Sequence, residues 1–179
     1  MQHKDYGWLS PQELVSCDSD NGGCEGGLAA AALVYIQKNG IVPETCYPYL
    51  GAVQACPSTC KDGSSFKSAR VCKCTTVINC GTFEGMKRCL TDGPITVRIL
   101  LYQDFIYYKS GIYCWDQKSV FIGGHALRCV GYGNSPEEYL EMANSWGAEW
   151  GERGFFKIST KTGCGARTTA NDAWTVKGC

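Results

Sequence analysis

The stretch Gly123-Gly124-His125-Ala126-Leu127, followed by Asn144-Ser145-Trp146-Gly147, is the most informative part of this sequence. Two glycines before a histidine let another backbone approach the imidazole, because neither glycine carries a side chain. An asparagine amide oxygen can accept a hydrogen bond from one ring nitrogen and so orient the ring. The adjacent Trp146 could cover that bond from water. A lone histidine is usually structural, but two such motifs together predict a proton-transfer pair, His125 and Asn144.

Composition predicts a folded globular chain. The 179 residues suffice for one sizeable domain or two lobes, and 44% of them are hydrophobic. The 17 basic and 17 acidic residues cancel, which favours neither nucleic acid nor an anionic membrane as a partner. The longest apolar run, Leu28 to Ile36, is shorter than the ~20 residues that span a bilayer.

The 13 cysteines indicate an oxidising compartment and a disulfide framework. Zinc binding is the competing interpretation, but the sequence has no Cys-x-x-Cys pair, and only His3 and His125 could add imidazole ligands. We therefore expect no metal and no cofactor. Residues 1–6 lack the apolar core of a secretory signal, so we expect a piece of a longer precursor that reaches a lysosomal, vacuolar or secreted location.

Local patterns predict helices in the first half of the chain. Ser10-Pro11-Gln12-Glu13 reads as a capping box, with Ser10 as N-cap and Glu13 reaching back to it, before a short helix through Val15. Leu28–Lys38 is apolar almost all round, which predicts a buried helix that Asn39-Gly40 ends. Residues 46–81 have no clear period and are expected to form loops held by disulfides.

The second half is predicted to be rich in strands. A helix near Phe83–Leu90 ends before Gly93-Pro94, and apolar residues then alternate from Ile95 to Leu101. Further strands are expected at Ala126–Val130, Tyr139–Ala143 and Phe155–Ile158, with His125 at the start of the first. This order predicts an α+β fold: one domain over 1–179 whose residues 1–92 form a mainly helical, disulfide-looped lobe and 93–179 a mainly β lobe.

Several further motifs occur in a fixed order. They are Leu9 to Asp18, Gly23-Cys24-Glu25-Gly26-Gly27, Tyr47-Pro48-Tyr49, Gly93-Pro94-Ile95, Tyr108 to Tyr113, Gly131-Tyr132-Gly133 and Trp150 to Phe155. With the histidine and asparagine motifs, they resemble papain-family cysteine peptidases, most closely cathepsin B and dipeptidyl peptidase I. The resemblance implies a papain-like two-lobed fold, with a helical lobe and an antiparallel, β-barrel-like lobe.

The resemblance also implies site residues. His125 would be the catalytic base and acid, and Asn144 would orient it. The substrate-binding positions would be Gly26, Gly27, Gly124, Trp146, Trp150 and Thr169. Thr169 stands where cathepsin B has a glutamate, so an apolar substrate side chain is expected there. No histidine lies between His3 and His125, so the histidine pair that gives cathepsin B its carboxydipeptidase activity is not expected.

The nucleophile of such enzymes lies ~130–150 residues before the histidine. Only residues 1–124 precede His125, so the cysteine, its helix and the oxyanion glutamine are expected upstream of Met1. Without that helix, one face of Leu28–Lys38 should be exposed. The resemblance implies a peptidase acting through thiolate attack and acyl-enzyme hydrolysis on peptides or proteins, with cystatin-type inhibitors as further partners. This chain alone is expected to be inactive, and the alternative is a pseudoprotease serving as an interaction or structural module.

The resemblance further implies the disulfides Cys17–Cys56 and Cys46–Cys60, each stabilising by about 2–4 kcal/mol. The other cysteines stay unassigned. Cys24 precedes a predicted helix whose dipole would activate a thiol, but a disulfide role with a partner outside the chain is preferred.

A geometric prediction follows if His125 and Asn144 face each other across antiparallel strands. Arg128 would then lie opposite Glu141, and such a charge pair stabilises by about 0.2–1 kcal/mol.

Overall fold

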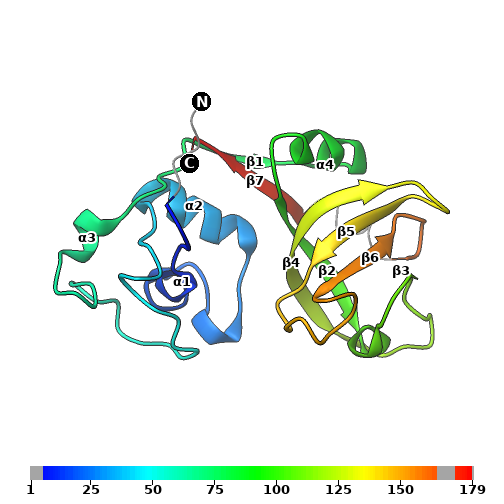
Figure 1. Cartoon of the computed structure of the whole chain (residues 1–179), viewed down its shortest axis with the longest axis horizontal. Helices are drawn as coiled ribbons and strands as arrows, with labels where there is room; N and C mark the ends of the chain where they lie inside the picture. The colour runs from blue at the N-terminus through cyan, green and yellow to red at the C-terminus, as the bar shows by residue number, and fades with distance from the viewer. Residues whose placement is uncertain (1–5, 165–171, 179) are drawn as a thin grey trace. The chain divides into compact units, whose positions relative to one another are not determined.

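A computed structural model describes residues 6–164 and 172–178, in two compact units. The helical unit comprises Met1–Ile78 with Val176–Cys179, and the sheet unit comprises Asn79–Thr175 (Figure 1). This division places the helix α4 (Phe83–Leu90) with the sheet, whereas the sequence pattern divides the chain after residue 92. The physical reason is that Met86 of α4 is fully buried in the same hydrophobic core as the buried residues of the strands.

The helical unit holds short helices around a long one. They are α1 (Pro11–Cys17), η1 (Gly23–Glu25), α2 (Ala29–Asn39) and α3 (Phe66–Ala69), with the strand β1 (Thr76–Asn79) at its boundary. Helix α2 ends at Gly40, whose φ of +75° suits glycine and whose amide donates to the Ile36 carbonyl. The α2 helix has no buried residue, so the predicted burial is wrong although the predicted helix is confirmed.

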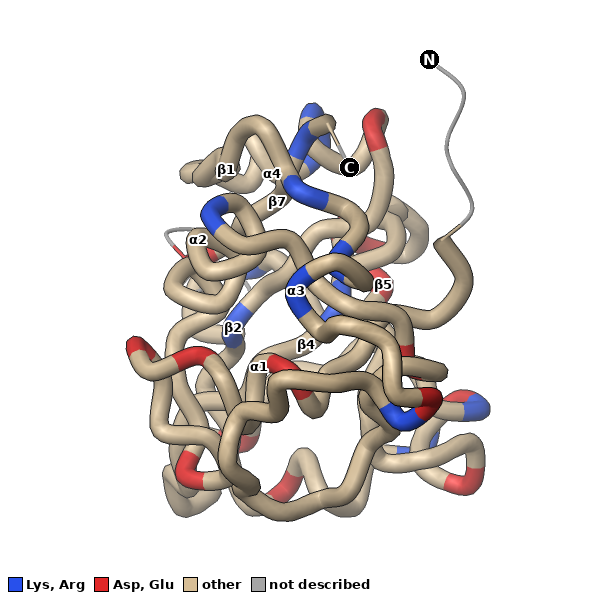
Figure 2. Tube along the Cα trace, turned by 90° about the vertical axis from the view of Figure 1, so that its left-hand side faces the viewer, with Lys and Arg blue, Asp and Glu red and all other residues tan. Residues whose placement is uncertain are grey.

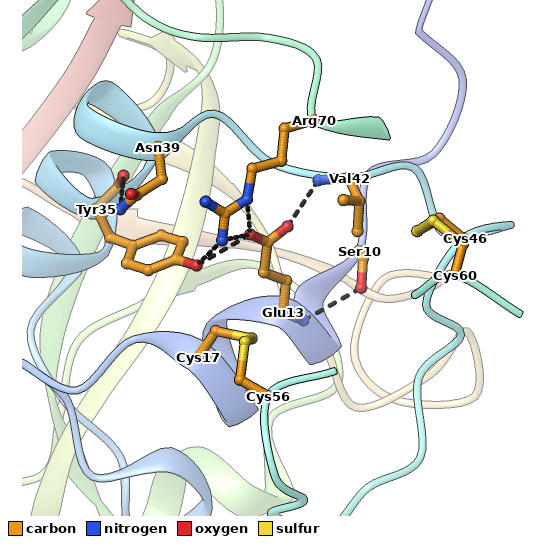
Figure 3. Close-up of polar contacts among 10 residues, drawn as sticks. All are labelled: Ser10, Glu13, Cys17, Tyr35, Asn39, Val42, Cys46, Cys56, Cys60 and Arg70. Atoms are coloured by element: carbon orange, nitrogen blue, oxygen red, sulfur yellow. Dashed lines mark hydrogen bonds and ion pairs between the residues drawn. A yellow bond between two sulfur atoms is a disulfide. The ribbon is translucent and has the colours of Figure 1, made fainter. Parts of the chain in front are cut away.

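One buried carboxylate ties this unit together (Figure 3). Ser10 Oγ caps α1 by accepting from the Glu13 amide at 3.2 Å, as predicted. The second predicted contact of the capping box, in which the Glu13 carboxylate reaches back to Ser10, is wrong because this carboxylate turns away from Ser10. It accepts from Val42 N at 2.7 Å, Tyr35 Oη at 2.9 Å and Arg70 Nε at 2.8 Å. Burial, followed by the charge of Glu13, raises the pKa of Tyr35, so the phenol stays a donor.

Disulfides hold the segment between residues 46 and 81. Cys17 is bonded to Cys56 and Cys46 to Cys60, the two pairs that the resemblance implies. The segment also contains α3 and β1, which the sequence pattern did not indicate. Each is only four residues long, too short to show a helical or strand period.

The sheet unit is built on β2 (Ile95–Tyr102), β4 (Phe121–Gly133), β5 (Tyr139–Ala143) and β6 (Phe155–Ser159). These confirm the predicted strands. The structure adds η2 (Gln103–Tyr107), β3 (Ile112–Tyr113) and β7 (Ala173–Lys177). The seven-stranded sheet has the order β1-β7-β2-β4-β5-β6-β3. The pairings β7/β2, β2/β4, β4/β5 and β5/β6 are antiparallel, but β3 runs parallel to β6.

Alternation along the strands builds the core. Buried residues include Ile95, Val97 and Ile99 on β2, Leu127 and Cys129 on β4, Leu140 and Met142 on β5, and Phe156 and Ile158 on β6. Their removal from water is the main stabilising term, at about 25 cal/mol per Å² of apolar surface. Disulfides Cys80–Cys89 and Cys114–Cys164 add covalent links within this unit.

The strand register corrects one prediction. Arg128 lies opposite Ala143 and not Glu141, because the β4/β5 register at Arg128 is displaced by two residues from the register in which His125 would face Asn144. A β-bulge between Cys129 and Gly131 offsets the pairs beyond it by one residue more. Glu141 instead pairs across the other edge of β5 with Lys157 of β6. The predicted pairing of Arg128 with Glu141 is therefore wrong.

Charges of both signs are distributed along the trace (Figure 2). Among the described residues, no helix has the length and apolar character needed to cross a membrane.

Candidate functional site

His125 lies inside β4, several residues after its start, which corrects the predicted position at a strand end. It pairs with Ile99 of β2 and, two residues before Leu127, faces the same side of the sheet as that core residue. The imidazole is half-buried, so its orientation is restrained by neighbours on one side and its other side is accessible.

Asn144 is the first residue after β5, and its amide donates to Gly154 O at 2.9 Å. Its Oδ1 lies 2.9 Å from His125 Nε2 and accepts from the Ser145 amide at 2.8 Å. Because the Ser145 N–H can only donate, the oxygen and not the nitrogen of the amide must face it. The neutral imidazole therefore carries its proton on Nε2, which leaves the lone pair on Nδ1.

The free ring nitrogen gives the pair its chemistry. Among the described residues, Nδ1 of His125 has no hydrogen-bond partner, whereas Nε2 is held by Asn144. A base whose far nitrogen is fixed by a third group can accept a proton in a defined direction. The arrangement is suited to moving a proton to and from an adjacent nucleophile.

Trp146 covers the pair. Its ring stacks on His125 with centroids 5.1 Å apart and an interplanar angle of 26°. It is itself packed against Phe105, at 5.6 Å, and Phe105 is fully buried. Trp150 also contacts Phe105, at 4.9 Å, and its Nε1 donates to Ile106 O at 3.1 Å. Phe105 is thus the hub that positions both tryptophans, a role that the sequence pattern did not reveal.

The loop after Trp150 has a backbone that requires glycine. Gly151 has φ +59°, and a Cβ there would lie 2.7 Å from Phe155 O. The following Glu152 accepts from the Gly111 amide at 2.8 Å and from Lys157 Nζ at 2.8 Å. These bonds tie the tryptophan-bearing loop to two other segments of the sheet unit.

Acid should loosen this loop. Hydrogen bonding to Lys157, followed by the Gly111 amide, lowers the pKa of Glu152 below its ordinary value of 4.5. A carboxyl whose folded pKa is depressed stabilises above its unfolded pKa, and that contribution is lost as pH falls through the folded value. We expect Glu152→Gln to lower the Tm at pH 7 by about 3 °C, and the difference to shrink below about pH 4.

Thermal unfolding followed by tryptophan fluorescence from pH 3 to pH 7 measures this difference. The matched control is Glu149→Gln, since Glu149 is a nearby exposed glutamate. A Tm difference for Glu152→Gln that does not change with pH would contradict the assignment.

The other predicted substrate-binding residues are divided between the units. Gly124 adjoins His125 in the sheet unit. Gly26 and Gly27 lie in the helical unit, along an open cavity of about 230 Å³ that Leu14, Val15, Leu28 and Ala32 also line. Asn21 supports this turn, since its Oδ1 accepts from Leu28 N at 2.7 Å. Thr169 lies outside the described residues.

Within residues 6–164 and 172–178, three cysteines are free thiols: Cys24, Cys74 and Cys129. Cys24 is exposed, whereas the other two are buried. Burial raises the pKa of Cys74, and it raises the pKa of Cys129 to about 12. Neither buried thiol is suited to be a nucleophile, because each resists ionisation and lies out of reach of solvent. Among the described residues, no cluster of His, Cys, Asp and Glu could hold a metal ion.

The chain is similar in sequence to known proteins. The profile of the papain family of cysteine proteases matches residues 1–174. Cathepsin B-like CP3 of Giardia intestinalis is 38% identical over 165 residues, which cover 87% of this chain and 54% of that protein. Chymopapain of Carica papaya is 35% identical over 158 residues, which cover 87% of this chain and 43% of that protein. The chain spans about half the length of these curated relatives.

Solved structures show the same fold. A cysteine protease of Carica candamarcensis in complex with E-64 matches with a TM-score of 0.77 and 28% identity, over 94% of this chain and 76% of that one. The proform of Amb a 11, a ragweed pollen cysteine protease, matches with a TM-score of 0.80 and 30% identity, over 94% of this chain and 46% of that one.

Proposed function

This chain belongs to the papain family of cysteine proteases, and we propose on that basis that it supplies the histidine and asparagine half of a cysteine peptidase site. The observation that carries the proposal is the 2.9 Å contact of His125 Nε2 with Asn144 Oδ1, which leaves Nδ1 to exchange protons. Trp146 supports it by stacking over the imidazole and limiting water around this bond.

The proposed reaction proceeds in two halves. A thiol gives its proton to Nδ1 of His125, and the thiolate attacks the peptide carbonyl carbon. The C–N bond breaks as the imidazolium protonates the leaving amine, which leaves a thioester. Water then gives a proton to Nδ1 and adds to the thioester. The C–S bond breaks, the sulfur regains its proton from the imidazolium, and the carboxylic acid product departs.

We propose that the attacking thiolate comes from a cysteine-bearing helix upstream of Met1. Within the described residues, Cys74 and Cys129 are buried, and Cys24 is proposed to be structural. The open cavity beside Gly26 and Gly27 and the lack of buried residues in α2 support a missing packing partner for this region.

Substrates are proposed to be peptides or proteins, with Gly26, Gly27 and Gly124 beside the substrate backbone and Trp150 on the leaving side. Thr169 would line a pocket for one substrate side chain. Cystatin-type inhibitors are proposed as further partners. The disulfides fit an oxidising compartment, and a lysosomal, vacuolar or secreted location is proposed.

The test compares the 179-residue chain with a chain extended upstream through its natural reading frame. We expect the extended chain to hydrolyse a fluorogenic peptide and to be labelled by a thiol-reactive peptide inhibitor on the upstream cysteine. The 179-residue chain should do neither. Cys24→Ser in the extended chain is the matched control and should still be labelled.

Two results would contradict the proposal. Hydrolysis by the 179-residue chain that Cys24→Ser abolishes would make Cys24 the nucleophile. An extended chain that has no upstream cysteine and no activity would favour a pseudoprotease, acting as an interaction or structural module.

A further inference from the structure

Arg98 on β2 lies next to the predicted substrate path. It pairs with Ala126 in the β2/β4 register and, like Ala126, faces away from the core. A Cβ built on Gly124 would lie 3.3 Å from Arg98 Cδ and 3.4 Å from Nη1. The arginine side chain therefore extends along the exposed surface of Gly124, the residue before His125.

Asp172 anchors this arginine by one end only. Arg98 Nε donates to Asp172 Oδ2, and the other carboxylate oxygen accepts from Trp174 Nε1 at 2.9 Å. Among the described residues, the two Nη groups of Arg98 have no acceptor. Its side chain remains 46% exposed. The guanidinium is thus held at Nε, and within the described part of the chain its Nη groups are left to bind a ligand beside Gly124.

This arrangement is suited to a carboxylate. A guanidinium presents parallel N–H donors that match the two oxygens of a carboxylate, and a fixed one loses less entropy on binding. The exposed Arg128, opposite Thr96, lies on the same outward face but further along β4 from Gly124, so it is a nearby arginine that does not adjoin the proposed substrate path.

We propose that Arg98 is a specificity-determining residue that favours substrates with an aspartate or glutamate side chain beside Gly124. The inference rests on the proposed function, which places the substrate backbone along Gly124. It differs from the apolar preference expected from Thr169, because Arg98 adds a cation to this side of the site.

The experiment uses the extended, active chain and acetylated, amidated peptides. At each position before the cleaved bond, a peptide with glutamate is compared with the same peptide carrying glutamine. The two peptides of a pair then differ only in one side-chain carboxylate. At one position, kcat/KM for glutamate should exceed that for glutamine about tenfold, equivalent to about 1.4 kcal/mol. Arg98→Ala should bring this ratio close to one, and Arg98→Glu should shift the preference to lysine. Arg128→Ala is the matched control and should keep the ratio.

The outcomes separate this inference from the proposed function. If peptides are cleaved but the ratio is near one, or survives Arg98→Ala, the inference is overturned and the function stands. If no peptide is cleaved, the function fails, and the same peptides are titrated into the 179-residue chain with the Gly124 and Ala126 amides followed by NMR. A glutamate peptide that shifts these amides no more than its glutamine twin overturns the inference. So does a glutamine peptide with a free C-terminus that matches the glutamate peptide, since a terminal carboxylate would then be the ligand.

Discussion

Replacing His125 with alanine is expected to lower kcat/KM of the upstream-extended protein by about 10⁴-fold, with little change in its stability. The imidazole is proposed both to form the thiolate and to protonate the leaving amine, and no other described side chain bonds to Asn144 Oδ1 in its place. Removing a base that serves both steps should remove most of the acceleration that depends on the nucleophile. Steady-state hydrolysis of a fluorogenic peptide measures the loss.

Asn144→Ala should cost less, roughly a hundredfold in kcat/KM, because Trp146 would still stack on the imidazole. Its signature should be a changed pH profile, since the amide oxygen that holds the protonated Nε2 is lost. The chain has two histidines, so His3→Ala is the matched control and should leave activity intact. A His125→Ala protein that retains more than about a tenth of the activity would remove the histidine from the proposed mechanism.

Much of the site could be predicted from sequence because its residues sit in short contiguous motifs. Gly124 and His125 are neighbours, and Asn144, Trp146 and Trp150 follow on one loop. The strands β2, β5 and β6 were predictable for a related reason, since alternating burial leaves a period-two pattern in the residues themselves.

Features that depend on distant contacts escaped prediction. The β4/β5 register places Arg128 opposite Ala143 and not Glu141, and no local pattern marks this register or the bulge beside it. Phe105 supports Trp146 and Trp150 from a short helix 41 and 45 residues earlier in the chain. Apolar composition predicts that α2 is buried, but composition reports what a surface prefers and not what covers it, and none of the residues of α2 is buried.

Glu13 illustrates the same limit with the largest expected effect on stability. Local sequence predicted a helix cap, but the carboxylate is fully buried and holds Val42, Tyr35 and Arg70. Glu13→Ala should destabilise the helical unit by about 3–5 kcal/mol, because Arg70 loses its counter-ion, and Arg70 Nε, Val42 N and Tyr35 Oη lose the oxygens to which they donate. Glu13→Gln should cost less, since its amide oxygen can still accept from Val42 N.

Urea unfolding of the 179-residue chain and its variants measures these changes, with the exposed Glu25→Gln as the matched control in the same unit. A second variant, Glu13→Gln with Arg70→Met, separates the ion pair from the remaining hydrogen bonds. The double variant should be more stable than Glu13→Gln alone. In Glu13→Gln the half-buried Arg70 keeps its charge without an anion, which is destabilising, and Arg70→Met removes that charge. A Glu13→Ala protein whose free energy of unfolding lies within about 1 kcal/mol of the original would show that the carboxylate does not organise the unit.

An activity measurement separates a structural role of Glu13 from a catalytic one. An extended Glu13→Gln chain that still hydrolyses peptides, at reduced stability, would show that Glu13 acts on the fold and leave the proton-transfer role to His125 and Asn144.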